Sequence, residues 1–116
     1  MSKVFIYGSI KKGFFNHGRF DFDKNVKFIG VAELKGAQMY NLGSYPCLVL
    51  TDNQEDVVLG ELYEYHDEEC EKKIKRMEEG AGYKEVEVEI EGMKVKTFIF
   101  EKVPENKKLV VDGVWR

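Results

Sequence analysis

The chain has 116 residues, of which 43% are hydrophobic and 34% are charged, a composition typical of one globular domain. Its aromatic content of 13% argues against disorder, and its formal net charge of −3 argues against nucleic-acid binding, which normally needs a concentrated basic face. No apolar segment is long enough to span a membrane, and the N-terminus lacks the features of a signal peptide. We therefore expect a single domain over residues 1–116, located in the cytoplasm.

Short apolar stretches separated by glycines predict a mostly β protein. Residues 4–7 form an apolar run that ends at Gly8, which predicts a buried central strand. Residues 26–40 favour strands with bends or bulges at Gly30 and Gly36. The other elements expected here are strands at 47–50 and 57–65, a short helical turn at 16–22, and a final strand or docked tail at 109–115.

Residues 85–100 give the clearest local pattern, which predicts a β-hairpin. Apolar and acidic residues alternate before the dipeptide Glu91–Gly92, which favours a two-residue turn. Such a turn pairs oppositely charged residues on one face of the two strands and apolar residues on the other face. The predicted cross-strand pairs are Glu89 with Lys94, Glu87 with Lys96, and Val88 with Val95.

One helix is predicted from about Asp67 to Glu79, with Asp67 as its N-cap. Gly80 and Gly82 are expected to end it. Together with the strands, this helix predicts an α+β fold. We expect a small, mixed, strongly bent sheet resembling a β-barrel, with one main helix packed on its outside.

The helix carries an acidic residue where its pattern calls for an apolar one. Cys70, Ile74 and Met77 form the apolar stripe, and Glu78 takes the next position on it. A carboxylate held against apolar surroundings has a raised pKa, which suits a general base or acid. Alternatively, Glu78 lies at the edge of the stripe and reaches water.

The segment Tyr7-Gly8-Ser9-Ile10 is a second candidate, because a predicted buried strand ends there in Gly-Ser. Backbone N–H groups in such a loop can bind an anion or an oxyanion, although an ordinary turn explains the pattern as well. The following residues exclude a nucleotide-binding P-loop, since Phe14-Phe15 replaces the required Lys-Ser/Thr. A third candidate is the turn Gly43-Ser44-Tyr45-Pro46, which is also compatible with a plain surface turn. The cysteines and histidines lack zinc-site spacing, so no metal or other cofactor is expected.

Four motifs follow one another along the chain. They are Tyr7-Gly8-Ser9-Ile10, Gly43-Ser44-Tyr45-Pro46, Gly60-Glu61-Leu62-Tyr63-Glu64 and Glu78-Glu79-Gly80-Ala81-Gly82-Tyr83. In this combination the sequence resembles the gamma-glutamylcyclotransferase-like family, which includes AIG2-like proteins and gamma-glutamylamine cyclotransferases, from about Lys3 to Phe100. The resemblance implies a cyclotransferase-like β-barrel. It also implies an enzyme that converts a gamma-glutamyl compound into 5-oxoproline and a free amine or amino acid.

The resemblance further implies roles for individual residues. Glu78 corresponds to the catalytic general base, and the loop Tyr7-Gly8-Ser9-Ile10 to the segment that holds the glutamyl part of the substrate. On the same basis we place Tyr45, Pro46 and Tyr83 in substrate binding. Glu79 is the alternative base, because it stands directly before Gly80, but it does not fall on the apolar stripe. Phe98 and Phe100 stand where some relatives have tyrosine, which removes a hydroxyl contact from that strand.

Two other functions remain open from the sequence. One is a non-catalytic module that binds a small acidic metabolite on the same fold. The other is a protein-interaction domain that uses the charged helix face at residues 68–76, although such a face is more often simply solvated. We expect a small-molecule gamma-glutamyl substrate, no nucleic-acid or membrane partner, and a monomer or weak homodimer. The motifs do not identify the leaving amine.

Overall fold

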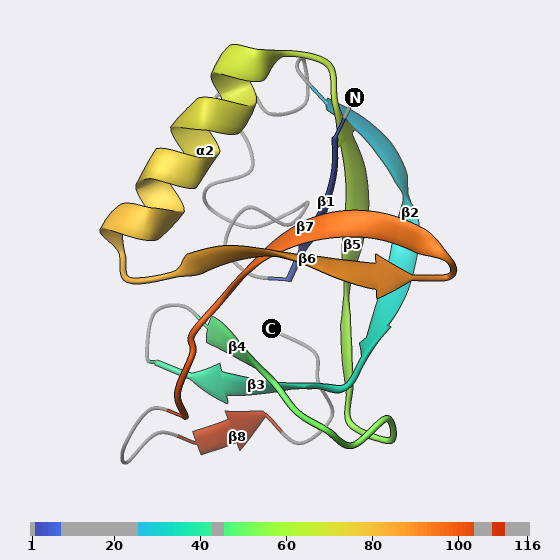
Figure 1. Cartoon of the computed structure of the whole chain (residues 1–116), viewed down its shortest axis with the longest axis vertical. Coiled ribbons are helices and arrows are strands. Elements are labelled where there is room, and N and C mark those ends of the chain that lie inside the picture. The colour runs from blue at the N-terminus through green and yellow to red at the C-terminus, as the bar shows by residue number, and fades with distance from the viewer. Residues whose placement is uncertain (1, 8–25, 43–45, 104–107, 111–116) are drawn as a thin grey trace.

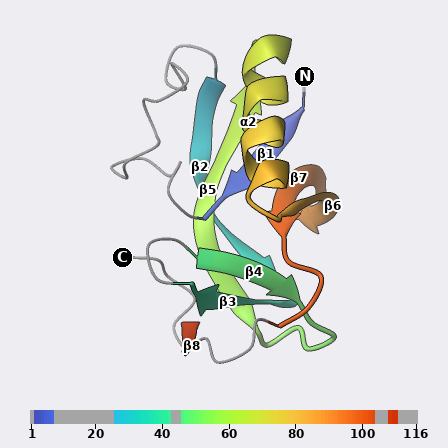
Figure 2. The ribbon, with the colours of Figure 1, turned by 90° about the vertical axis from the view of Figure 1, so that its left-hand side faces the viewer.

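The computed structural model describes residues 2–7, 26–42, 46–103 and 108–110. Their strands form a five-stranded sheet in the order β2-β5-β1-β7-β6 and a three-stranded sheet in the order β4-β3-β8 (Figure 1). Helix α2 lies beside the five-stranded sheet, and the three-stranded sheet lies beyond the end of the helix (Figure 2). The elements are β1 (Lys3–Ile6), β2 (Val26–Lys35), β3 (Ala37–Asn41), β4 (Pro46–Leu50), β5 (Val57–Tyr65), α2 (Glu68–Gly80), β6 (Lys84–Ile90), β7 (Met93–Ile99) and β8 (Lys108–Val110). Among the described residues, no helix is long and apolar enough to cross a membrane.

Strand β1 occupies the centre of the five-stranded sheet, which confirms the interpretation of the N-terminal apolar run. It pairs antiparallel with β5 and parallel with β7, so the sheet is mixed. Because successive side chains of a strand point to opposite faces, Val4 and Ile6 enter one apolar cluster and Phe5 enters another. The first cluster also takes Cys70 and Ile74 from α2, so it is the core beneath the helix.

The predicted irregularities in the second strand are also confirmed. The register of β2 against β5 shifts between Phe28 and Gly30, which is a β-bulge. At Gly36 the backbone takes a φ of +76°, a conformation that favours glycine, and the chain turns from β2 into β3 of the other sheet.

The expectation that the sheet closes into a barrel is wrong. In the described part of the chain, no hydrogen-bonded ladder joins the edge strands β2 and β6. Strand β2 leaves the sheet at Gly36 and continues into β3, so its edge diverges from β6 instead of pairing along it (Figure 1). The sheet is strongly bent but open.

The hairpin formed by β6 and β7 has the predicted register in every pair. Glu89 lies opposite Lys94, Glu87 opposite Lys96, and Val88 opposite Val95. Both turn residues have positive φ angles, 51° at Glu91 and 81° at Gly92. Two consecutive positive φ angles are the signature of a type I′ turn, whose twist matches that of the strands it joins.

Gly60 allows β5 to pass unusually close to β1. A Cβ atom at this position would lie 2.6 Å from the Ile6 carbonyl oxygen and 2.6 Å from Cζ of Phe5. Real Cβ atoms do not approach other atoms so closely, so only glycine fits here without a shift of the neighbours. The position lies beside Ile6, the last residue of β1, which directly precedes Tyr7.

Candidate active site at the end of helix α2

The N-terminus of α2 is capped as the sequence predicts, but its C-terminus differs. Asp67 accepts a hydrogen bond from the backbone N–H of Glu69 at 3.3 Å. The helix continues through Gly80, one residue beyond the predicted end, and Gly82 takes the left-handed conformation with a φ of +96°. Only Gly82 therefore acts as the terminating glycine.

Two backbone hydrogen bonds close this helix end. The N–H of Tyr83 donates to the carbonyl of Glu78 at 3.0 Å, and the N–H of Gly82 donates to the carbonyl of Glu79 at 3.1 Å. This pair of bonds defines a Schellman motif. Because the motif joins the backbone of Glu78 directly to that of Tyr83, it places both residues on the same end of the helix.

Glu78 and Glu79 lie in different environments. Glu79 is exposed, whereas Glu78 is half-buried beside the apolar cluster under the helix. Burial raises the pKa of Glu78 from 4.5 to about 7, and no hydrogen bond or ion pair from the described residues counteracts this shift. The direction is the one expected from the apolar stripe. A carboxylate with this pKa both accepts and donates protons near neutral pH.

Two buried tyrosines lie close to Glu78, and both are tied to backbone carbonyls. The hydroxyl of Tyr7, at the end of β1, donates to the carbonyl of Phe98 on β7. The hydroxyl of Tyr83 donates to the carbonyl of Pro46 on β4. Burial raises the pKa of Tyr7, and the nearby Tyr83 and Glu78 raise it further. The phenol of Tyr7 therefore remains protonated at neutral pH.

These contacts hold the two sheets together at one place. Besides the Tyr83–Pro46 bond, the N–H of Phe100 donates to the carbonyl of Leu48 at 2.9 Å, which joins the end of β7 to β4. The rings of Tyr83 and Phe100 pack with their centroids 4.8 Å apart. Glu78 thus stands at a junction between the five-stranded sheet, the three-stranded sheet and the end of α2. We refer to Tyr7, Pro46, Glu78, Tyr83 and Phe100 as the junction site.

The structure brings four of the predicted site residues to this junction, namely Tyr7, Pro46, Glu78 and Tyr83. Four others, Gly8, Ser9, Ile10 and Tyr45, lie outside the described residues, as does the helical turn expected at 16–22. The sequence did not indicate Cys47, which is buried, adds to the raised pKa of Tyr7, and has a thiol whose own pKa burial raises to about 11. Its neighbourhood depends on the packing of β4 against β1, for which no local pattern exists.

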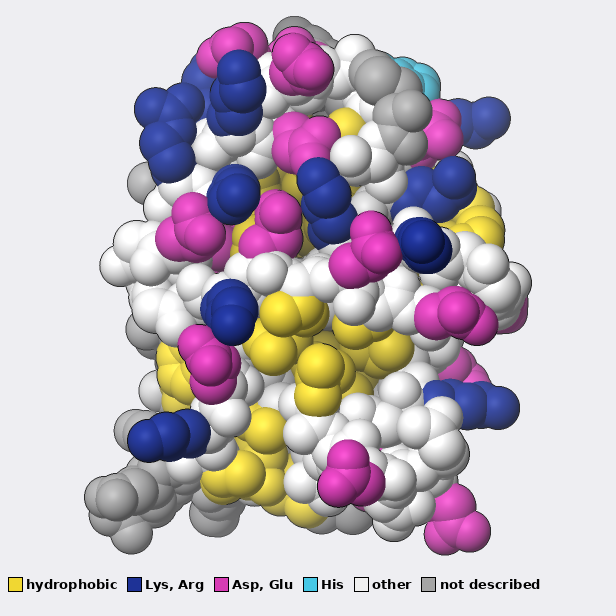
Figure 3. Space-filling model, in the orientation of Figure 1, with side chains coloured by type: hydrophobic (Ala, Val, Ile, Leu, Met, Phe, Trp, Pro, Cys, Tyr) yellow, Lys and Arg dark blue, Asp and Glu magenta, His cyan; other side chains and the backbone are white. Residues whose placement is uncertain are grey.

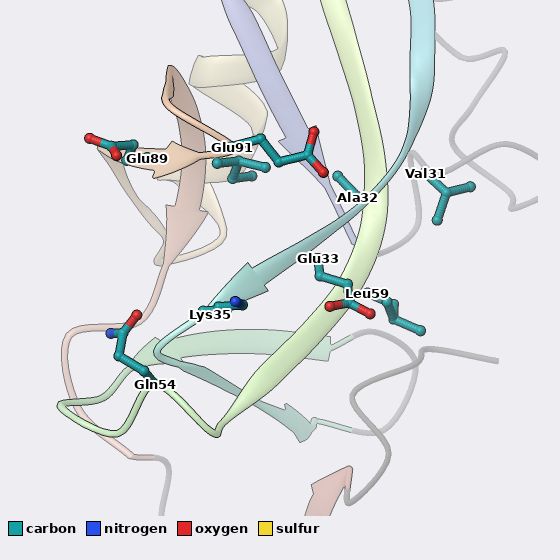
Figure 4. Close-up of a pocket in the computed structure, with 9 residues that line it drawn as sticks. Val31, Ala32, Glu33, Lys35, Gln54, Leu59, Glu89 and Glu91 are labelled. Carbon is teal, nitrogen blue, oxygen red and sulfur yellow. The ribbon is translucent and has the colours of Figure 1, made fainter.

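A separate hollow of about 510 Å³ lies between β2 and the tip of the hairpin, where the sheet stays open (Figure 4). It is bordered by Glu33 and Lys35 of β2 and by Glu89 and Glu91 at the tip of the hairpin. Its carboxylates stand apart, and no three His, Cys, Asp or Glu side chains in the described part of the chain are grouped to hold a metal ion. Glu78 does not border this hollow, so the hollow and the junction site are separate candidate sites.

Comparison with known proteins fits this geometry. The sequence matches the family described as gamma-glutamyl cyclotransferase, AIG2-like, over residues 4–116. The chain belongs to this family. Over 78 residues it is 37% identical to a protein of Methanocaldococcus jannaschii named "Putative gamma-glutamylcyclotransferase MJ1514". That alignment covers 67% of this chain and 59% of the relative, so the chain spans less than two thirds of the relative's length.

Several solved structures share the fold of this chain. An uncharacterized protein of Pyrococcus horikoshii superimposes with a TM-score of 0.80 at 26% identity, covering 98% of this chain and 89% of that one. The protein ytfP of Escherichia coli gives a TM-score of 0.75 at 22% identity, with 97% and 95% covered. An AIG2-like protein of Mus musculus gives 0.69 at 23% identity, with 88% and 77% covered. This chain therefore shares its overall fold with these proteins, including one described as AIG2-like.

Proposed function

We propose that the protein is a gamma-glutamylcyclotransferase whose general acid/base is Glu78. Family membership supports the reaction class, and the observation that carries the assignment to this residue is the half-buried carboxylate with a pKa of about 7. Among the residues of the junction site, Glu78 alone has a side chain able to exchange a proton near neutral pH.

The proposed reaction closes a five-membered ring within the substrate. The α-amine of the gamma-glutamyl group attacks the γ-carbonyl carbon, forming a new C–N bond, and the original bond from that carbon to the leaving nitrogen breaks. Because both reacting groups belong to one molecule, the enzyme has only to fold the substrate and move protons. Glu78 takes a proton from the α-ammonium group before the attack and later delivers it to the leaving nitrogen, while the second proton lost by the attacking nitrogen passes to solvent, so that 5-oxoproline and a free amine result.

We assign the loop Tyr7-Gly8-Ser9-Ile10 to the glutamyl part of the substrate. Tyr7, where this loop begins, is close enough to Glu78 for the carboxylate to affect its pKa. Backbone N–H groups after Tyr7 would hold the α-carboxylate or the oxyanion that develops during attack. Losing one oxyanion donor typically lowers the rate about 10²–10³-fold, which is the scale of effect expected from this loop.

Beside Glu78, the junction site presents two packed aromatic rings. The rings of Tyr83 and Phe100 lie against each other, and the carbonyl of Pro46 accepts the hydrogen bond of the Tyr83 hydroxyl. We therefore propose that Tyr83 and Pro46 bind substrate through shape and apolar contact rather than through charge. We propose a corresponding contact from Tyr45, which directly precedes Pro46 in the sequence.

A panel of gamma-glutamyl compounds tests the proposal. The protein is incubated with gamma-glutamyl amino acids, gamma-glutamylamines and ε-(γ-glutamyl)lysine, and 5-oxoproline is detected by mass spectrometry. Release of 5-oxoproline by the native protein and not by Glu78→Gln supports the assignment. Binding of these compounds without turnover in either protein would instead indicate a non-catalytic module for small acidic metabolites.

A further inference from the structure

Helix α2 has few apolar contacts with the rest of the protein. Only Cys70 and Ile74 are buried along its whole length, and Met77 is partly buried. The other helix side chains are half-buried or exposed. A helix held by so short an apolar stripe depends on polar contacts for its precise placement.

The strongest polar contact of α2 is made with the hairpin. The Nζ atom of Lys96 lies 2.8 Å from Oε2 of Glu71, and the two side chains are only 33% and 21% exposed. The hydrogen bond to Glu71 is the main cause of the raised pKa of Lys96. By contrast, Lys72 and Glu69 are 3.9 Å apart and about two-thirds exposed, at 64% and 66%, and such pairs contribute little. The Lys96–Glu71 pair is short, directional and partly shielded from salt.

Lys96 is itself fixed in place by its neighbours on both sides. It is paired with Glu87 on β6 and with Val4 on the central strand β1. Its position is therefore set by the middle of the five-stranded sheet. An ion pair from this position ties the helix to the most constrained part of the fold.

Glu71 and Glu78 lie on the same face of α2. They are seven residues apart, with Lys75 between them, and this spacing of four and three residues forms one stripe along a helix. Lys75 approaches Glu85 of β6 to 3.9 Å, so the stripe faces the hairpin. Side chains of both charges gather over α2 and the hairpin, as Figure 3 shows. Because a helix rises about 1.5 Å per residue, Glu78 lies about 10 Å beyond Glu71 on a rigid rod.

We propose that Lys96 is a positioning residue for Glu78: its ion pair with Glu71 holds α2 against the hairpin and so keeps the Glu78 carboxylate at the junction site. The kinetic consequence of this inference rests on the proposed function, whereas its structural consequence does not. Without Lys96, none of the described cations lies at hydrogen-bonding distance from the partly buried Glu71 carboxylate. The helix then moves outward to hydrate Glu71, and Glu78 moves with it.

Measuring the pKa of Glu78 distinguishes an outward movement of α2 from the simple loss of the positive charge of Lys96. On the elements packed around Glu78, burial raises the pKa values of Tyr7 and Tyr65, so both phenols are neutral at pH 7. Removing the positive charge of Lys96 would by itself raise the pKa of Glu78, because a nearby cation favours the ionised carboxylate. Outward movement of the helix lowers it, because the carboxylate regains water. The two explanations therefore predict opposite signs.

The test compares Lys96→Met with Lys94→Met, which removes the same charge from an exposed position of the same strand. The pKa of Glu78 is measured by NMR titration of a ¹³C-labelled carboxyl group, together with kcat and KM for 5-oxoproline release. In Lys96→Met we expect the pKa to fall from about 7 to roughly 6 or lower and kcat to fall about tenfold or more, with KM little changed. Lys94→Met should change none of these, and Lys96→Arg should restore both.

An unchanged or raised pKa in Lys96→Met would overturn the inference. If Lys96→Met does not fold, Lys96→Gln, which keeps an N–H donor for Glu71, is compared with the same control and the same direction is expected. The titration needs no turnover, so a protein that releases no 5-oxoproline refutes the proposed function while the pKa of Glu78 still decides the role of Lys96.

Discussion

Replacing Glu78 with Gln should make the protein more stable at alkaline pH while abolishing its activity. The side chain keeps its size but loses its charge. The pKa of Glu78 is about 7 against an ordinary value of 4.5, a difference of about 2.5, which corresponds to about 3 kcal/mol. Because the pKa of Glu78 is raised in the folded state, its protonated side chain contributes fully to the free energy of unfolding below about pH 4.5. This contribution is lost as the pH rises through 7. The charged carboxylate therefore destabilises the native protein at pH 8.

Urea unfolding of both proteins at pH 4.5 and pH 8 measures this difference. Glu78→Gln should match the native protein at the lower pH and exceed its free energy of unfolding by about 2–3 kcal/mol at the higher pH. In the same samples, turnover should fall by the ~10²–10⁴ that general acid–base catalysis supplies. The exposed Glu79 provides the matched control, and Glu79→Gln should change neither quantity. A Glu78→Gln protein that is less stable at pH 8, or that remains active, would refute the account of this residue as a buried catalytic carboxylate.

Three further outcomes follow from the same contacts. The kcat/KM of the native protein should rise with pH through about 7 and then level off, because Glu78 must lose its proton to act as a base; a pH–rate profile without this rise would contradict that role. Tyr83→Phe leaves the buried carbonyl of Pro46 without its donor and should lower the free energy of unfolding by about 1–3 kcal/mol in urea titrations, whereas Tyr40→Phe, which loses only a half-buried bond to a neighbouring side chain, should cost less. Ile74→Ala should cost about 2–5 kcal/mol, and a smaller loss would mean that the core beneath α2 collapses to fill the space.

Local pattern was sufficient to predict the elements whose structure is decided by near neighbours. The hairpin register follows from a two-residue turn and alternating charges, and the start of α2 follows from Asp67 as a capping residue. The orientation of Glu78 towards the apolar core follows from helical spacing alone. In each case the interacting residues lie within a few turns or one hairpin of each other, so the sequence displays them together.

Features that depend on distant parts of the chain were not predictable in the same way. Whether β2 meets β6 depends on the path the chain takes after Gly36, and the sheet stays open as a result. The contact of Lys96 with Glu71 joins a strand to a helix, although the sequence indicated only its cross-strand partner Glu87. Hydrogen bonds from tyrosine hydroxyls to backbone carbonyls could not be predicted from the sequence. Every residue has a backbone carbonyl, so the type of side chain does not indicate which one accepts the bond.

The close passage of β5 over β1 at Gly60 limits how this protein can change during evolution or in directed-evolution libraries. Even a methyl group there would push against the Phe5 ring and the Ile6 carbonyl, and both would shift β1, which leads directly into Tyr7. Position 60 thus constrains the junction site although it is not one of that site's residues. Variants that alter substrate choice should therefore be sought with Gly60 held fixed, because a change there would disturb the geometry on which all of them depend.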